Sequence, residues 1–202
     1  MPTWKEVTTA NPAHSENYAR KWKILESQGQ DIHGEARFVD ALAERHSRIL
    51  DAGCGTGRLG GYLIRQGHTV VGTDVDPILI RHAESDHPDG TWYVGDLSSD
   101  PIAEEEFDVV VSAGNVMGFL AKEGREFALQ NIYDSMRTSG RFVTGFGAGR
   151  GWEFTDFLAT AQKIGFTLDY RFGGWDLTPF DESSTFLVAL FTKPGVGGHL
   201  LA

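Results

Sequence analysis

A glycine-rich segment at residues 51–57, with the sequence Asp-Ala-Gly-Cys-Gly-Thr-Gly, is the part of the chain that most directly suggests chemistry. It stands between residues 48–52, a short apolar strand-like run, and residues 58–66, a helix-like run ended by Gly67. Glycines allow the backbone to approach a ligand and to adopt dihedral angles closed to other residues. The following helix start presents free N–H groups. The segment therefore predicts a ligand site beyond the carboxyl end of a strand.

Asp74 lies 23 residues after Asp51, one strand–helix–strand step further along the chain. A carboxylate at this place can accept two hydrogen bonds from a ribose diol, which indicates a nucleoside cofactor. Two kinds of protein combine these features. The NAD fingerprint is G-x-G-x-x-G, whereas the spacing here is G-x-G-x-G, and Arg58 occupies the place of the third NAD glycine.

The chain also resembles the class I S-adenosyl-methionine-dependent methyltransferases, and the resemblance covers roughly residues 33–193. Four segments carry it, in the family's order and at its spacing: Ile49-Leu-Asp-Ala-Gly-Cys-Gly-Thr-Gly57, Val71-Gly-Thr-Asp-Val-Asp-Pro77, Val94-Gly-Asp-Leu97 and Phe107-Asp-Val-Val-Val-Ser-Ala-Gly-Asn115.

The resemblance implies S-adenosyl-methionine as cofactor, with a set of binding positions: Asp51, Ala52, Gly53, Gly55, Thr56, Gly57, Asp74, Val75, Asp96, Leu97, Ala113, Gly114, Asn115 and Tyr18. The segment 51–57 would hold the methionine part, together with residues 113–115 near the methyl group. Asp74 would bind the ribose and Val75 would pack on the adenine. Asp96 and the backbone of Leu97 would bind the adenine edge. Tyr18 would cover the cofactor.

Methyl transfer from a sulfonium is a one-step displacement, so the enzyme mainly holds the two reactants in line. It requires no metal and no nucleophilic residue, and we predict no metal site. A general base helps only where the acceptor is protonated. The candidate catalytic residues are Asn115, His14 and His33. A surface or structural role stays open for both histidines, since no pattern pairs them with a carboxylate.

The candidate residues of the acceptor pocket follow strands or lie in the last long loop: Phe119, Arg150, Trp152, Trp175 and Phe180. Arg37 is a further candidate, as a clamp for an acceptor carboxylate. The alternative is that the aromatic residues pack the domain and that Arg37 forms a surface salt bridge.

Alternating strand-like and helix-like runs predict an α/β fold with a doubly wound, mostly parallel sheet of seven strands. We expect strands at 48–52, 69–74, 91–95, 107–112, 141–145, 166–175 and 185–193. We expect helices at 13–27, 33–46, 58–66, 123–137 and 153–164, and a further helix that begins at residue 77. No helix fits between the last two strands, so they should pair antiparallel near the C-terminal edge. Residues 1–46 would form a helical lid on the same domain, with the first ten residues loose, 47–193 the core and 194–202 a loose tail.

The chain of 202 residues carries 18 basic and 28 acidic residues, a net charge of −10, and one cysteine, Cys54. This balance disfavours nucleic acid as a partner, and the single thiol excludes a disulfide framework. No run is apolar enough for a membrane span. We therefore expect a cytoplasmic monomer or homodimer.

The sequence Asn115-Val-Met-Gly118 lacks the Asn/Asp-Pro-Pro-aromatic motif of methyltransferases that act on bases or glutamine. We therefore predict a small-molecule acceptor. A non-catalytic cofactor sensor or interaction module and an NAD-dependent oxidoreductase are the alternatives.

Overall fold

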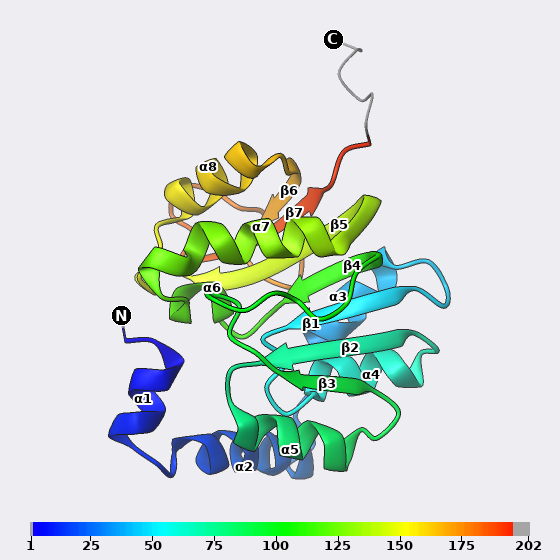
Figure 1. Ribbon diagram of the computed structural model, residues 1–202, viewed down its shortest axis with the longest axis vertical. Helices are drawn as coiled ribbons and strands as arrows, with labels where there is room; N and C mark the ends of the chain where they lie inside the picture. Colours follow the sequence, from blue (N-terminus) through cyan, green and yellow to red (C-terminus); the bar gives the residue numbers. More distant parts are fainter. Residues whose placement is uncertain (1, 196–202) are drawn as a thin grey trace.

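One seven-stranded sheet organises the protein in the computed structural model, which describes residues 2–195. The strand order is β3-β2-β1-β4-β5-β7-β6 (Figure 1). The strands are β1 (Arg48–Ala52), β2 (Thr69–Asp74), β3 (Thr91–Val94), β4 (Phe107–Ser112), β5 (Met136–Gly147), β6 (Thr167–Phe172) and β7 (Phe186–Thr192). Only β7 runs antiparallel to its neighbours, β5 and β6, in the described sheet. The predicted mostly parallel sheet with one antiparallel strand near the C-terminal edge is confirmed.

Helices cover both faces of the sheet. They are α1 (Trp4–Ala10), α2 (His14–Ser27), α3 (Gly34–Leu42), α4 (Arg58–Arg65), α5 (Pro77–Asp86), α6 (Val116–Phe119), α7 (Arg125–Ser135) and α8 (Phe154–Ile164), with a 3-10 turn at Lys122–Gly124. Apolar side chains of α3, α4 and α5 form one core layer, and those of α7 and α8 form the other. Helix α2 packs on α5.

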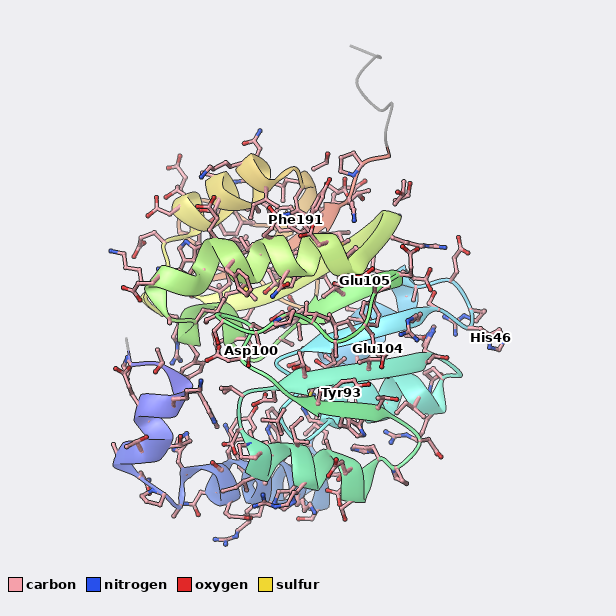
Figure 2. The ribbon with its side chains drawn as sticks, viewed as in Figure 1. His46, Tyr93, Asp100, Glu104, Glu105 and Phe191 are labelled. Atoms are coloured by element: carbon pink, nitrogen blue, oxygen red, sulfur yellow. The ribbon has the colours of Figure 1, made fainter. Side chains whose placement is uncertain are left out.

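The central strands are buried on both faces, which explains their nearly continuous apolar sequences. The apolar run of β7 is likewise buried. Phe191 of β7, labelled in Figure 2, stacks on Phe142 with ring centroids 5.8 Å apart and also contacts Phe157 of α8. Aromatic burial thus fixes the antiparallel strand beneath the second helical layer.

The start of the chain contradicts the prediction that the first ten residues are loose. Trp4–Ala10 forms α1, and Thr3 and Glu6 close a capping box, since each side chain accepts from the other's backbone N–H. This reciprocal arrangement satisfies two free N–H groups at the helix start. The predicted tail 194–202 lies largely outside the described residues.

Several other boundaries differ from prediction, since α3 ends at Leu42 and not at residue 46, and β6 ends at Phe172 and not at residue 175. Helix α7 ends at Ser135, because Met136 already pairs with Phe107 and begins a longer β5 than the expected 141–145. The register shifts after this pair, so a bulge separates it from the regular ladder. The short helix α6 was not expected from the sequence.

The carboxyl ends of the parallel strands meet at one edge of the sheet, on the side where α1 and α6 lie (Figure 1). Strand β1 pairs with β2 on one side and with β4 on the other, so the strand order reverses beside β1. Open α/β sheets bind ligands at this reversal point.

Candidate active site

A cavity of about 340 Å³ opens at the carboxyl edge of the sheet, a volume typical of small-molecule sites. Most of the predicted cofactor residues line it: Gly53, Gly55, Asp74, Val75, Asp96, Leu97, Ala113, Gly114, Asn115 and Tyr18. Residues far apart in the sequence therefore converge where the strand order predicts a ligand.

The glycine turn forms the floor of this cavity. Gly53, Gly55 and Gly57 have φ angles of +87°, +54° and +72°, a region that side chains disfavour. A Cβ atom at Gly53 would lie 2.3 Å from Cγ2 of Val116. The N–H groups of Gly53 and Cys54 donate to the Thr73 carbonyl over 2.8 and 3.0 Å. The turn is thus fixed by its backbone, with few N–H groups left for a pyrophosphate.

Other predicted cofactor residues lie behind the turn. Asp51 and Thr56 line a smaller hollow of about 30 Å³, next to the main cavity and sharing Tyr18 with it. The buried Asp51 carboxylate accepts from the Gly60 N–H over 3.2 Å, which ties β1 to the first turn of α4. Burial raises the pKa of Asp51 to about 7. Ala52 is fully buried, and Gly57 is the N-cap of α4.

Asp74 ends β2 and presents its carboxylate to the cavity. Its Oδ2 accepts from the Gly55 N–H over 2.8 Å and its Oδ1 from the Asp76 N–H over 2.9 Å. Burial raises the pKa of Asp74 to about 6, although these hydrogen bonds favour the ionised form. The carboxylate is therefore held in one orientation, with remaining lone pairs available to hydroxyl donors.

Asp96 and Leu97 follow β3 on the same side of the cavity. Oδ1 of Asp96 accepts from the Ser98 N–H over 2.9 Å, and Oδ2 forms an ion pair with Lys5 over 2.7 Å. The backbone N–H of Asp96 donates to Asp100, labelled in Figure 2. Burial opposes ionisation, yet the hydrogen bonds from Lys5 and Ser98 hold the pKa of Asp96 below its usual range.

Residues of the first helix line the cavity, although the sequence analysis expected this part of the predicted lid to be loose. Trp4 of α1 donates its Nε1–H to Oδ2 of Asp76 over 2.8 Å. Its ring lies edge-on to His14, Tyr18 and Phe119, with centroids 5.0, 5.4 and 5.5 Å away. We call α1 the cover helix. The capping-box sequence Thr3-x-x-Glu6 was the signal that could have located it.

Tyr18 of α2 lies beside the glycine turn: a Cβ at Gly55 would be 3.6 Å from its ring. Burial raises the pKa of its phenol, so the hydroxyl stays protonated. Asn115 begins α6 with a φ of +66°, and its Oδ1 accepts from the Gly147 N–H over 2.8 Å. The side-chain carbonyl oxygen of Asn115 is therefore already hydrogen-bonded to the backbone of β5.

Three residues proposed near the acceptor do line the cavity, namely His14, Phe119 and Arg150. His33 does not. It lies beside Tyr62 of α4, with ring centroids 5.1 Å apart, and is wrong as a catalytic candidate. Arg37 is also wrong as a clamp, because its exposed guanidinium pairs with Asp31 outside the cavity.

The three other rim aromatics pack the domain and do not line the cavity. Trp152 is buried against Phe157, with centroids 5.2 Å apart. Trp175 packs beside Phe38 of α3, on the opposite helical layer, 5.7 Å between centroids. Phe180 packs against Phe154, 6.0 Å between centroids. The packing alternative therefore holds for all three, because their rings fill gaps between helices and sheet.

Arg58 and Cys54 have structural roles. Arg58 forms an ion pair with Glu35 over 3.2 Å, donates to the Ile32 carbonyl and stacks over Trp22 at 4.2 Å. It thereby joins α4 to the segment between α2 and α3. Cys54 is buried, and burial raises the pKa of its thiol, which keeps it unreactive.

Residues 2–195 contain no group of three or more histidine, cysteine or acidic side chains placed to hold a metal ion. No helix within that range is long and apolar enough to cross a membrane.

The donor set of the cavity fits an adenosine-containing cofactor. Asp74 offers a fixed carboxylate for a ribose diol, and the Leu97 N–H donates to none of the residues 2–195. The glycine turn leaves room where side chains would stand. The apolar residues Val75 and Leu79 line the same cavity as Asp74.

Comparison with known proteins supports this geometry. The family described as "Methyltransferase domain" matches residues 49–140. The crystal structure of a TehB-like S-adenosyl-methionine-dependent methyltransferase from Corynebacterium glutamicum is 61% identical, covers 91% of this chain and 100% of that chain, and superposes with a TM-score of 0.88. A methyltransferase structure from Clostridium acetobutylicum, 11% identical with a TM-score of 0.77 over 89% of this chain and 99% of that one, shares the fold.

Curated relatives are more distant. An 18S rRNA (guanine-N(7))-methyltransferase of Schizosaccharomyces pombe is 29% identical, covering 77% of this chain and 61% of its own. A malonyl-[acyl-carrier protein] O-methyltransferase of Pectobacterium atrosepticum is 32% identical, covering 48% of this chain and 43% of its own. The chain spans about half the length of the curated relatives it matches. The sheet order, the glycine turn and the high identity to a solved member together show that this chain is a class I S-adenosyl-methionine-dependent methyltransferase.

Proposed function

We propose that this methyltransferase acts on a small-molecule acceptor held between the glycine turn and the cover helix. The observation that carries the proposal is the cavity of about 340 Å³, which continues from the cofactor residues to His14, Phe119 and Arg150. The cover helix lies over it and is fastened on two sides, by Trp4 and by Lys5. A site covered in this way suits a compact acceptor.

The cofactor residues divide into two groups in this proposal. Asp74 accepts from the ribose hydroxyls, while Asp96 and the Leu97 N–H bind the adenine edge and Val75 packs on its face. The methionine part lies along Gly53, Gly55 and the strand end at 113–115, with Asp51, Ala52, Thr56 and Gly57 behind it. Tyr18 closes the cofactor from above, since its ring lies 3.6 Å from the place where a Cβ of Gly55 would stand.

When bound, S-adenosyl-methionine supplies an electrophilic methyl group. A lone pair of the acceptor forms the new bond to the methyl carbon, while the carbon–sulfur bond breaks and its electron pair remains on sulfur. The protein's residues orient the acceptor and exclude water. Asn115, fixed by its hydrogen bond to Gly147, positions the acceptor, and His14 takes the acceptor proton where one must leave.

The preference for small acceptors rests on the cover and on charge. The net charge of −10 opposes a phosphate backbone. The curated relatives include an enzyme named for 18S rRNA and one named for an acyl-carrier protein. A test of acceptors must therefore include RNA and a carrier protein beside small molecules. We further propose that residues 1–46 act as a cover that opens to admit the acceptor.

The first experiment is calorimetric titration with S-adenosyl-methionine, S-adenosyl-homocysteine and NAD in parallel. We expect micromolar binding of the first two and none of NAD. A methylation screen with a labelled cofactor then compares small acceptors with RNA and a carrier protein. Binding without turnover on any acceptor would favour a sensor, and salt-sensitive methylation of RNA would overturn the small-molecule proposal.

A further inference from the structure

Resting on the proposed function, we propose that the acceptor joins an apolar ring to an anionic group, and that Arg150 binds the anion. Arg150 is thus a specificity-determining residue of the site, and the acceptor class is that of small aromatic acids.

Arg150 is an exposed residue that lines the cavity, and its guanidinium has no partner among the described residues. It forms no ion pair and no hydrogen bond with any of the residues 2–195. Five other arginines pair with carboxylates: Arg37, Arg45, Arg48, Arg58 and Arg137. In a chain with 28 acidic residues, the arginine that lines the cavity has been left free to bind a ligand.

The base of the Arg150 side chain is held in place. A Cβ at Gly118 would lie 2.7 Å from both the Cβ and the carbonyl oxygen of Arg150, so the backbone of α6 packs directly against it. A Cβ at Gly147 would lie 3.7 Å from its Cγ. The residue therefore starts from a fixed point beside Asn115, while its guanidinium remains free.

Charged side chains of both signs line the cavity. The two carboxylates that line it, Asp74 and Asp96, lie at its cofactor end and already accept hydrogen bonds from the protein. Lys5 is neutralised by Asp96 over 2.7 Å. Arg150 is the remaining formal charge among the described lining residues. Guanidinium binds carboxylates through two parallel hydrogen bonds, which favours an anionic acceptor.

Aromatic side chains form one wall of the cavity. Trp4 and Phe119 meet edge to face at 5.5 Å, and both line the cavity. The edge of His14 completes the same wall, 5.0 Å from Trp4. Such side chains pack favourably on a planar apolar ring. A ring bearing a carboxylate satisfies both features.

Benzoate and its neutral isostere benzamide are the probes for this proposal. We would titrate each into the free enzyme and into the enzyme saturated with S-adenosyl-homocysteine, using ligand-observed NMR. We expect wild type to bind benzoate about tenfold more tightly than benzamide. Arg150→Gln should abolish this preference, and Arg150→Lys should keep part of it. The matched control Arg81→Gln, an exposed arginine on α5 outside the cavity, should behave as wild type.

The two levels of the proposal fail differently. If S-adenosyl-homocysteine binds but wild type does not distinguish benzoate from benzamide, the inference is overturned and the proposed function stands. The same holds if Arg150→Gln keeps the preference. If S-adenosyl-homocysteine does not bind, the proposed function fails, and the titrations of the free enzyme still decide whether Arg150 binds the anion.

Discussion

The floor and the cover of the cavity are held in different ways. The floor, residues 51–57, is fixed by backbone hydrogen bonds and by glycines with positive φ angles. The cover helix buries none of its residues fully and is held by two side chains, Trp4 and Lys5. Backbone geometry fixes the floor, whereas a few side-chain contacts hold the cover, so we expect the cover to open at a lower free-energy cost than the floor.

The largest effect is expected from Gly53→Ala. The substitution strains a φ of +87° and places a methyl 2.3 Å from Val116, so the free energy of unfolding should fall by about 2–5 kcal/mol. Gly34→Ala is the matched control, because nothing lies within 4 Å of its Cβ, and it should stabilise by about 0.4–1 kcal/mol. Urea denaturation measures both. Equal effects of the two variants would show that the floor is not rigid.

Asp74→Ala should weaken cofactor binding by about 1.5–3 kcal/mol, because it removes a charge-assisted acceptor for the ribose. The fold should persist. Calorimetry with S-adenosyl-homocysteine measures the loss, and Glu182→Ala, an exposed acid outside the cavity, is the control for charge. Unchanged affinity in Asp74→Ala would refute its assignment to the ribose.

The raised pKa of Asp74, about 6, predicts that cofactor affinity depends on pH. Hydroxyl donors favour the ionised carboxylate, so affinity should be constant above pH 6 and fall by up to about tenfold per unit below it. Asp74→Asn should remove this dependence. A fall that begins near pH 7 and survives in Asp74→Asn would assign the effect to Asp51 instead, whose pKa is about 7.

The cover should give a smaller effect. Trp4→Ala removes the bond to Asp76 and the contacts with three aromatic neighbours, so cofactor affinity should fall about threefold to tenfold. Amides of α1 should exchange faster, while the free energy of unfolding should change by less than about 1 kcal/mol. Trp4→Phe keeps the ring contacts without the donor. If neither exchange nor affinity changes in Trp4→Ala, the cover is held by other contacts.

The floor could be predicted from the sequence because its determinants are local. The glycine spacing, Asp74 at a strand end and the Asp76-Pro77 helix start each lie within one turn or one strand–helix step. The Asp76 side chain does accept from the Ile78 N–H over 2.8 Å, as expected of an N-cap. The mostly parallel sheet with one antiparallel strand near its C-terminal edge followed from the pattern of strands and helices.

The sequence predicted a helical lid over residues 1–46, but helix α1, its anchoring and the packing of the rim could not be predicted, because their contacts join distant parts of the chain. Trp4 is 72 residues from Asp76, and Lys5 is 91 from Asp96. Sequence spacing also does not tell which face of the last strands a loop side chain reaches. Trp175 illustrates this, because its ring lies in the space that Gly145 leaves open, where a Cβ would be only 2.6 Å away.

The distant anchoring of the cover helix has a consequence for biosynthesis. Asp76 is synthesised 72 residues after Trp4, which corresponds to roughly 4–14 s at ordinary translation rates. The cover helix therefore cannot dock on Asp76 before this interval has passed. During that interval the nascent chain carries the Trp4 indole without the carboxylate that accepts its hydrogen bond in the folded enzyme.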